Sequence, residues 1–219
     1  MRKLFLIFFG WLMFANNCFS QTAPFANEIL AFKKQDSVHL PPKGAILFVG
    51  SSSFNYWKDV QNYFPGYKII NRGFGGSSLT DVIRYANDII FPYHPKQIVI
   101  YCGENDLAGS DDVTGEIVFQ RFRTLFALIR TKIPGENIVF VSLKPSPSRK
   151  NLMSKMEVAN KLIQQFISSQ QNASFVDVYH KMLNPDGSPI GRIFKEDSLH
   201  MNPNGYAIWK KAIEPYLTK

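Results

Sequence analysis

The segment that decides the fold occupies residues 45–53 and reads AILFVGSSS. Its first five residues are apolar without polar alternation, the pattern of a strand that is covered on both faces. A glycine and three serines follow at once, from Gly50 to Ser53. In parallel sheets the functional side chains follow the carboxyl ends of the strands. The segment therefore predicts a buried strand and a candidate functional residue directly after it.

Four more runs rich in Ile, Val, Phe and Tyr follow along the chain. They predict strands at residues 68–70, 97–102, 137–143 and 174–178. Between them, Thr114 is placed to cap a helix that the pair at 134–135, Pro and Gly, ends. Apolar residues at helical spacing predict two further helices near 156–166 and 206–213. Alternating strands and helices predict an α/β fold, a three-layer α/β/α sandwich with a mainly parallel five-stranded sheet.

The chain shows no internal repeat and no domain linker, so we predict one domain at 45–219 behind a lead-in at 21–44. Residues 1–20 resemble a targeting signal more than a structural element of the domain. They combine a basic start, an apolar run at 4–15 and small residues near Ser20, as a secretory signal peptide does. We therefore expect an exported protein, periplasmic or secreted.

Two alternatives concern the same N-terminal segment. An uncleaved anchor is disfavoured because the apolar run falls short of the roughly 20 residues that a spanning helix needs. A lipid-anchored form through Cys18 is disfavoured by the two asparagines at 16–17, where small residues are wanted. We expect no stable membrane span in the mature protein.

Charge and composition exclude several classes of protein. The net charge is +8, but Lys and Arg are dispersed and form no patch of the kind that binds nucleic acid. Past the signal segment Cys102 is the one cysteine, so no intrachain disulfide is expected, and a small buried side chain explains it best. His39 and His94 lack acidic partners at useful spacing, so we expect neither a metal site nor a cofactor.

Polar motifs follow the first three predicted strands. Ser52 follows the first, a glycine-rich segment at 71–78 follows the second, and Asn105 follows the third. Taken singly, each has a plain structural role as a helix cap or a turn. The segment at 71–78 lacks the spacing and the lysine of a phosphate-binding loop.

Asp197 and His200 form a fourth motif, just before the last predicted helix. At this spacing within one helical turn the two side chains would face each other. An aspartate so placed holds an imidazole in the tautomer that accepts a proton from serine. Asp177 and His180 repeat the spacing, but we predict Asp177 to lie in a strand, where side chains three residues apart point to opposite faces.

In this order the motifs resemble those of the SGNH hydrolase family, also called GDSL-like lipases or acylhydrolases. The resemblance runs from residue 47 to 209 and includes Asn-Pro-Asn-Gly-Tyr after the histidine. The resemblance implies that Ser52 is the nucleophile and that Gly76 and Asn105 supply oxyanion donors, the latter through its amide. It also implies that Asp197 and His200 are the acid–base pair. It also implies the flavodoxin-like fold of that family.

Two details refine the resemblance. Gly-Gly-Ser, Gly-Glu-Asn-Asp and the segment Lys144–Pro147 are similar to the platelet-activating-factor-acetylhydrolase-like branch. The family's usual aspartate before the nucleophile is Ser51 here, which leaves three consecutive serines at 51–53 as candidates. The lead-in Phe48-Val49-Gly50 matches the family only if Ser52 is the nucleophile.

The resemblance implies a serine esterase that forms an acyl-enzyme, with His200 as the base and Asp197 as the acid that orients it. The oxyanion donors that it implies are the backbone N–H groups of Ser52 and Gly76 and the side-chain amide of Asn105. We expect short acyl groups, such as acetyl esters on sugars or small molecules. The alternatives are a lysophospholipase- or lipase-like acylhydrolase and a non-catalytic relative that binds carbohydrate or lipid.

Overall fold

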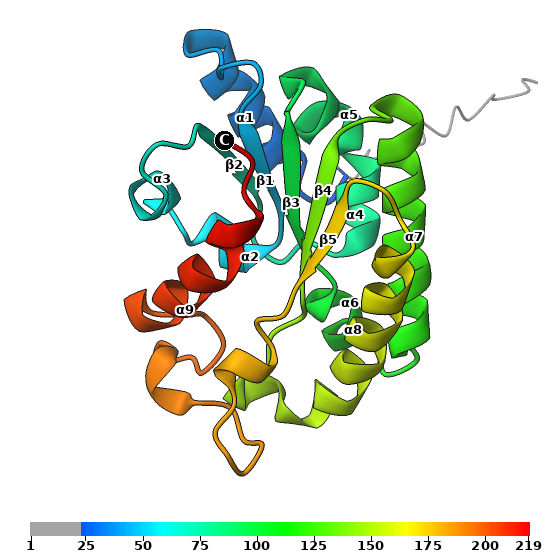
Figure 1. The fold of residues 1–219 in the computed structure, drawn as a ribbon, viewed down its shortest axis with the longest axis vertical. Coiled ribbons are helices and arrows are strands. Elements are labelled where there is room, and N and C mark those ends of the chain that lie inside the picture. Colours follow the sequence, from blue (N-terminus) through cyan, green and yellow to red (C-terminus); the bar gives the residue numbers. More distant parts are fainter. Residues whose placement is uncertain (1–22) are drawn as a thin grey trace, which may run out of the picture.

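The sheet is all parallel and has five strands in the order β2-β1-β3-β4-β5. Its strands are β1 (Ile46–Gly50), β2 (Ile69–Gly73), β3 (Gln97–Tyr101), β4 (Asn137–Val141) and β5 (Ala173–Val176). The computed structural model describes residues 23–219, so the predicted signal segment lies outside the described residues. The predicted three-layer α/β fold with a five-stranded parallel sheet is confirmed (Figure 1).

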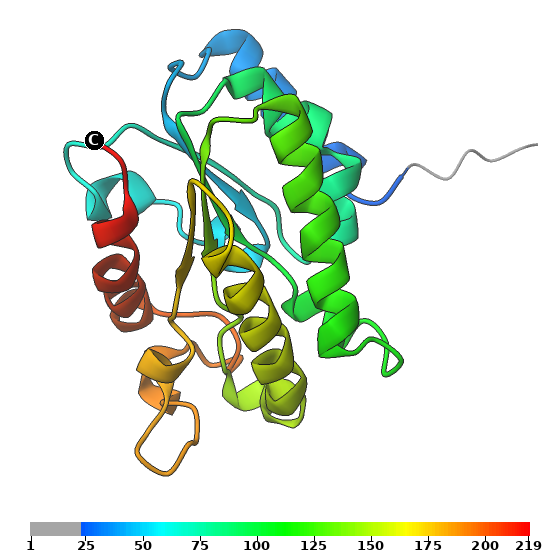
Figure 2. The same ribbon diagram turned by 45° about the vertical axis from the view of Figure 1, so that its right-hand side comes forward.

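Helices cover both faces of the sheet (Figure 2). One layer contains α1 (Ala26–Val38), α4 (Leu79–Arg84), α5 (Ala86–Ile89), α7 (Gly115–Lys132) and α8 (Met153–Ser168). The other contains α2 (Ser52–Asn55), α3 (Val60–Tyr63) and α9 (Pro203–Ile213), and α6 (Glu104–Ala108) follows β3 at the carboxyl edge. Within residues 23–219, none of the helices has the length and apolar character that a bilayer crossing requires.

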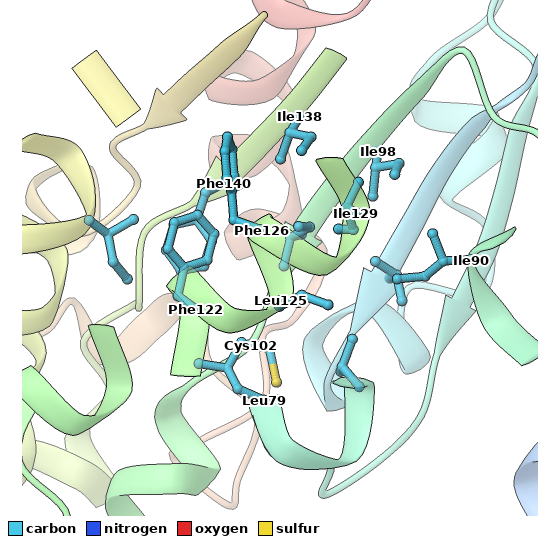
Figure 3. Packing of buried hydrophobic residues seen from close by; sticks show 14 of the residues in the cluster. Leu79, Ile90, Ile98, Cys102, Phe122, Leu125, Phe126, Ile129, Ile138 and Phe140 are labelled. Atoms are coloured by element: carbon cyan, nitrogen blue, oxygen red, sulfur yellow. The ribbon is translucent and has the colours of Figure 1, made fainter. Parts of the chain in front are cut away.

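The central strand β1 contributes to both apolar cores. Leu47 and Val49 face α7, whereas Ile46 and Phe48 face α9, and all four are fully buried. This explains the continuous apolar run in the sequence, because a strand covered on both faces has no solvent side. Figure 3 shows part of the first core, where the labelled side chains include Ile98, Phe122, Leu125, Phe126, Ile129, Ile138 and Phe140.

The structure differs from the sequence prediction at β2 and in the lead-in. The second strand reaches Gly73 instead of ending at residue 70, because Asn71–Gly73 keep the parallel register with β1. The Asn71 side chain donates to the carbonyl of Phe54 at 2.7 Å, so a polar residue is satisfied inside the strand. The lead-in contains a helix, α1, that the sequence analysis did not anticipate.

Gly50 marks a close approach between β1 and β3. Its φ of 141° lies in the region that favours glycine. A Cβ there would lie 1.9 Å from the carbonyl oxygen of Tyr101. That same oxygen accepts the N–H of Ser51 at 3.0 Å, so the two strands are held together at the point where the chain turns into α2.

Gly50→Ala is expected to lower the free energy of unfolding by more than about 4 kcal/mol or to prevent folding, because backbone atoms would have to separate. Urea unfolding followed by circular dichroism measures this. Gly135→Ala is the matched control, since its Cβ would meet nothing within 4 Å and its φ is ordinary. Equal stability of the two variants would contradict the role assigned to Gly50.

Candidate active site

The predicted site residues gather at the carboxyl edge of the sheet. Ser52 begins α2 directly after β1, and Gly76 follows β2. Asn105 lies in α6, which starts three residues after β3 ends. Asp197 and His200 lie in the long segment between β5 and α9. All five therefore occupy the edge at which open parallel sheets bind their ligands.

Ser52, His200 and Asp197 form a continuous hydrogen-bonded array. Ser52 Oγ lies 3.1 Å from His200 Nε2, and His200 Nδ1 lies 2.6 Å from Asp197 Oδ2. The imidazole is 18% exposed and the carboxylate 47%, so the pair is open to solvent on the aspartate side. With Nδ1–H donated to the carboxylate, Nε2 presents its lone pair to the serine hydroxyl.

A tight turn sets the aspartate–histidine geometry, which corrects the prediction of a helical turn. Asp197 Oδ1 accepts the backbone N–H groups of Leu199 and His200 at 3.0 and 2.9 Å. Ser198 between them has a φ of 56°, a left-handed conformation that closes the turn. Partial burial alone would raise the pKa of Asp197, but these backbone N–H groups and the His200 ring lower that pKa well below its usual range. The carboxylate therefore stays ionised.

The last helix fixes this turn against Ser52. Asn202 caps α9 by accepting the N–H of Asn204 at 2.9 Å, and its amide donates to the carbonyl of Arg192 at 2.9 Å. Tyr206, one helical turn later, donates to the carbonyl of Ser53 at 2.9 Å. The motif after the histidine therefore anchors α9 to α2, which places His200 beside Ser52.

The register among the three serines follows from their contacts. Ser51 Oγ accepts a hydrogen bond from the Asn105 amide at 2.7 Å. Ser53 is 2% exposed. Ser52 is partly exposed, and its hydroxyl is the one that lies on His200. The geometry therefore favours Ser52 as the nucleophile, as the sequence register did.

Two backbone N–H groups remain available beside Ser52. Within residues 23–219, neither the N–H of Ser52 nor that of Gly76 donates a hydrogen bond to another residue. Gly76 is exposed and has a φ of 81°, a left-handed conformation that favours glycine. Unpaired N–H groups beside a nucleophile can hold the oxygen of a carbonyl under attack.

Asn105 has three hydrogen-bond partners. Its amide nitrogen donates to Ser51 Oγ at 2.7 Å and to the carbonyl of Ser77 at 3.0 Å. Its oxygen accepts from Arg149 at 2.7 Å. No motif in the sequence indicates Arg149, which lies further along the segment that follows β4; its place in a segment after a strand is the one signal that it shares with the other site residues. An oxyanion at this site would therefore share an Asn105 N–H with Ser51 or with the Ser77 carbonyl.

Asp177 and His180 also form a pair, contrary to the prediction from strand geometry. Strand β5 ends at Val176, so Asp177 lies in a turn and its Oδ2 reaches His180 Nδ1 at 2.7 Å. The His180 side chain is 76% exposed, and in the described part of the chain its Nε2 meets no serine hydroxyl. This pair therefore lacks the serine hydroxyl that His200 Nε2 meets.

The remaining candidates from the sequence lie apart from the array. His39 and His94 precede β1 and β3, at the amino edge of the sheet. Cys102 is fully buried, and burial raises the pKa of its thiol well above the usual range, which keeps it protonated and unreactive. Across residues 23–219 no three His, Cys, Asp or Glu side chains converge as metal ligands would.

A buried polar cluster lies beneath the site. Lys144 is 1% exposed, and its Nζ lies 3.1 Å from Glu104 Oε2. Tyr101 donates its hydroxyl to the same carboxylate. Burial lowers the pKa of Lys144, which Glu104 counteracts, and burial together with Glu104 raises the pKa of Tyr101. Glu104 adjoins Asn105 in α6, so this cluster anchors the start of the helix that carries the amide.

An α/β sheet with a Ser–His–Asp array and free N–H groups at its carboxyl edge defines a hydrolase-like protein. The model of the GDSL-like lipase/acylhydrolase family matches residues 48–208, so the chain belongs to that family. Comparison with curated proteins gives no significant match.

Solved structures with the same fold share little sequence with this chain. A protein from Streptococcus pneumonia, provisionally assigned as a platelet activating factor, is 20% identical with a TM-score of 0.76, over 88% of this chain and 92% of its own. A GDSL-like lipase from Bacteroides thetaiotaomicron is 18% identical with a TM-score of 0.73, over 86% and 96%. A mutant of an acetyl-xylooligosaccharide esterase from Geobacillus Stearmophilus is 15% identical with a TM-score of 0.61, over 82% and 97%.

Lys144→Met is expected to lower the free energy of unfolding by about 3–5 kcal/mol, because it leaves the buried Glu104 carboxylate without its counter-charge. Adding Glu104→Gln should recover much of this loss, since the amide is neutral and still accepts from Tyr101. Urea titration measures both variants. Exposed Lys150→Met is the control, expected within about 0.5 kcal/mol of the parent; a Lys144→Met protein as stable as this control would disprove the role of the pair.

Proposed function

We propose that the chain is a serine esterase that removes short acyl groups, acetyl esters on carbohydrates above all, through an acyl-enzyme. The observation that carries the proposal is the array in which Ser52 Oγ lies 3.1 Å from His200 Nε2 and His200 Nδ1 lies 2.6 Å from Asp197. Membership of an acylhydrolase family supports the same chemistry.

Acylation begins as Ser52 Oγ attacks the ester carbonyl and His200 Nε2 takes its proton. Asp197 holds the imidazole through Nδ1–H and stabilises the imidazolium that forms. The tetrahedral intermediate collapses as His200 returns the proton to the departing alcohol oxygen, which leaves an ester on Ser52. Water, deprotonated by His200, then attacks this ester, and the collapse of the second intermediate releases the acid and restores the serine.

Negative charge develops on the carbonyl oxygen in both steps. Within residues 23–219 the N–H groups of Ser52 and Gly76 have no other acceptor and are free to receive it, and the amide of Asn105, in α6, lies against the neighbouring Ser51 hydroxyl. Loss of one such donor costs about 10²–10³ in turnover. The neutral Ser51 hydroxyl is a weaker competitor for the Asn105 amide than the usual aspartate, because charged acceptors form stronger hydrogen bonds.

An aromatic ring beside the histidine favours a sugar as the alcohol portion. The centroid of Tyr56 lies 4.5 Å from that of His200, and Tyr56 is 47% exposed. Lys195 Nζ lies 5.1 Å from the same ring, within cation–π range. An exposed aromatic face offers apolar contact to the C–H face of a pyranose, while the lysine offers donors to its hydroxyls. The structurally similar acetyl-xylooligosaccharide esterase is consistent with this substrate class.

Ser52→Ala is expected to lower kcat on p-nitrophenyl acetate by at least about 10³-fold and to abolish labelling by a fluorophosphonate probe, with the circular dichroism spectrum unchanged. Ser51→Ala should remain labelled, because it keeps the nucleophile and loses only an acceptor of Asn105. Labelling that survives in Ser52→Ala and disappears in Ser51→Ala would move the nucleophile by one residue. An unlabelled parent protein would favour a non-catalytic relative.

The two histidine pairs give a second, matched comparison. His200→Ala should lose activity to an extent similar to Ser52→Ala, because the base and the nucleophile act as one unit. His180→Ala removes the same side chain from the exposed pair and should retain the activity of the parent. The reverse result, in the same p-nitrophenyl acetate assay, would assign the base to His180.

Tyr56→Ala is expected to raise KM for acetylated xylo-oligosaccharides about 5-fold or more and to leave kinetics on ethyl acetate nearly unchanged, since only the sugar would use the ring. Tyr216→Ala is the control: it is similarly exposed but its carbonyl binds Gln97 at the amino edge of the sheet. Initial rates on both substrates and on a lysophospholipid provide the measurement. A lysophospholipid turned over faster than the acetylated sugars would overturn the carbohydrate assignment.

A further inference from the structure

Arg149 contacts the candidate oxyanion amide directly. One of its terminal nitrogens donates to Asn105 Oδ1 at 2.7 Å. Within residues 23–219 no carboxylate lies within ion-pairing distance of this guanidinium. A charged arginine bound to a neutral amide, with no acid to satisfy it, calls for a reason beyond ion-pair stability.

The partners of Asn105 determine which way its amide points. A carbonyl oxygen only accepts, so the contact with Ser77 requires the nitrogen of Asn105 on that side. A guanidinium only donates, so the contact with Arg149 requires the oxygen on the other side. Without Arg149, the orientation would rest on the Ser77 carbonyl and on a Ser51 hydroxyl that can both donate and accept.

The backbone holds Arg149 in place. The residue follows two prolines in the segment after β4, and its φ of −120° and ψ of 28° interrupt the short helical run at Pro147–Leu152. The N–H of Ser148 donates to the carbonyl of Ser198 at 3.1 Å, within the turn between Asp197 and His200. One segment thus contacts both the candidate amide donor and the turn that carries the base.

We infer that Arg149 is a positioning residue of the esterase site: it holds the Asn105 amide with its nitrogen toward Ser51 and Ser77, beside the candidate nucleophile Ser52. This inference rests on the proposed function. It assigns Arg149 no contact with the substrate, so the effect of its loss should pass through Asn105 and should appear in turnover.

Arg149→Met keeps the aliphatic bulk and removes every donor. It is expected to lower kcat on p-nitrophenyl acetate about 10- to 100-fold, less than or equal to the loss of a whole oxyanion donor, with KM changed less than about 2-fold. Lys150→Met removes an adjacent exposed charge and should leave kcat and KM at the values of the parent. This control separates positioning of the amide from a general loss of positive charge. Arg149→Lys retains a donor and should fall between the parent and Arg149→Met.

The decisive experiment is a double-mutant cycle with Asn105→Ala. If Arg149 acts through the amide, Arg149→Met should cause little further loss in the Asn105→Ala background. A full additional 10- to 100-fold loss there, or a loss that appears in KM alone, would overturn the inference.

The side-chain amide of Asn105 provides a readout that does not depend on activity. In protein labelled with ¹⁵N-asparagine, the signal absent from Asn105→Ala identifies it. This signal should shift in Arg149→Met and remain in place in Lys150→Met, and an unmoved signal would overturn the inference. A parent protein without esterase activity would instead refute the proposed function, and the amide signal would still report on the contact.

Discussion

The site depends on the close approach of β1 and β3 at Gly50. The Tyr101 carbonyl oxygen lies 1.9 Å from the position that a Cβ of residue 50 would take, and it accepts the N–H of Ser51 at 3.0 Å. This contact stops β1, starts α2 and turns Ser52 out over the carboxyl edge of the sheet. The same parallel register places the end of β3, and with it Asn105, one strand away. Packing of two central strands therefore places the candidate nucleophile, one serine within a row of three, at an accessible position.

Charge is distributed around this edge in two layers. Below it, Lys144 and Glu104 neutralise each other in a buried pair that anchors the start of α6. Above it, Arg149 and Lys195 lie without carboxylate partners in the described part of the chain, one on the Asn105 amide and one over Tyr56. The buried pair supports the structure of the site, and the two cations above it contribute a positive electrostatic field. A positive field suits a reaction in which a neutral ester acquires negative charge.

Ser51 connects the two halves of the site. A carboxylate at that position would hold the Asn105 amide strongly and place a negative charge beside the developing oxyanion. The hydroxyl accepts the same N–H without that charge. Ser77 and Arg149 then determine the orientation of Asn105, because the Ser77 carbonyl can only accept a hydrogen bond and the Arg149 guanidinium can only donate one. With serine in place of the family's usual aspartate, the orientation of the Asn105 amide therefore depends on Arg149, in the segment after β4.

The sequence by itself determined the parallel α/β class, the family and the position of polar motifs after the first three strands, because buried strands and the polar residues after them form local patterns. It did not reveal α1, or that Asp177 and His180 would also pair in a turn. The sequence favoured Asp197 and His200, and the tertiary structure brings a serine hydroxyl to this pair alone among the described residues. Ser52 and His200 are 148 residues apart, and their contact depends on how α9 packs on α2. The same holds for Arg149, Tyr56 and Lys144, because their neighbours lie far away in the sequence and a local pattern does not identify them.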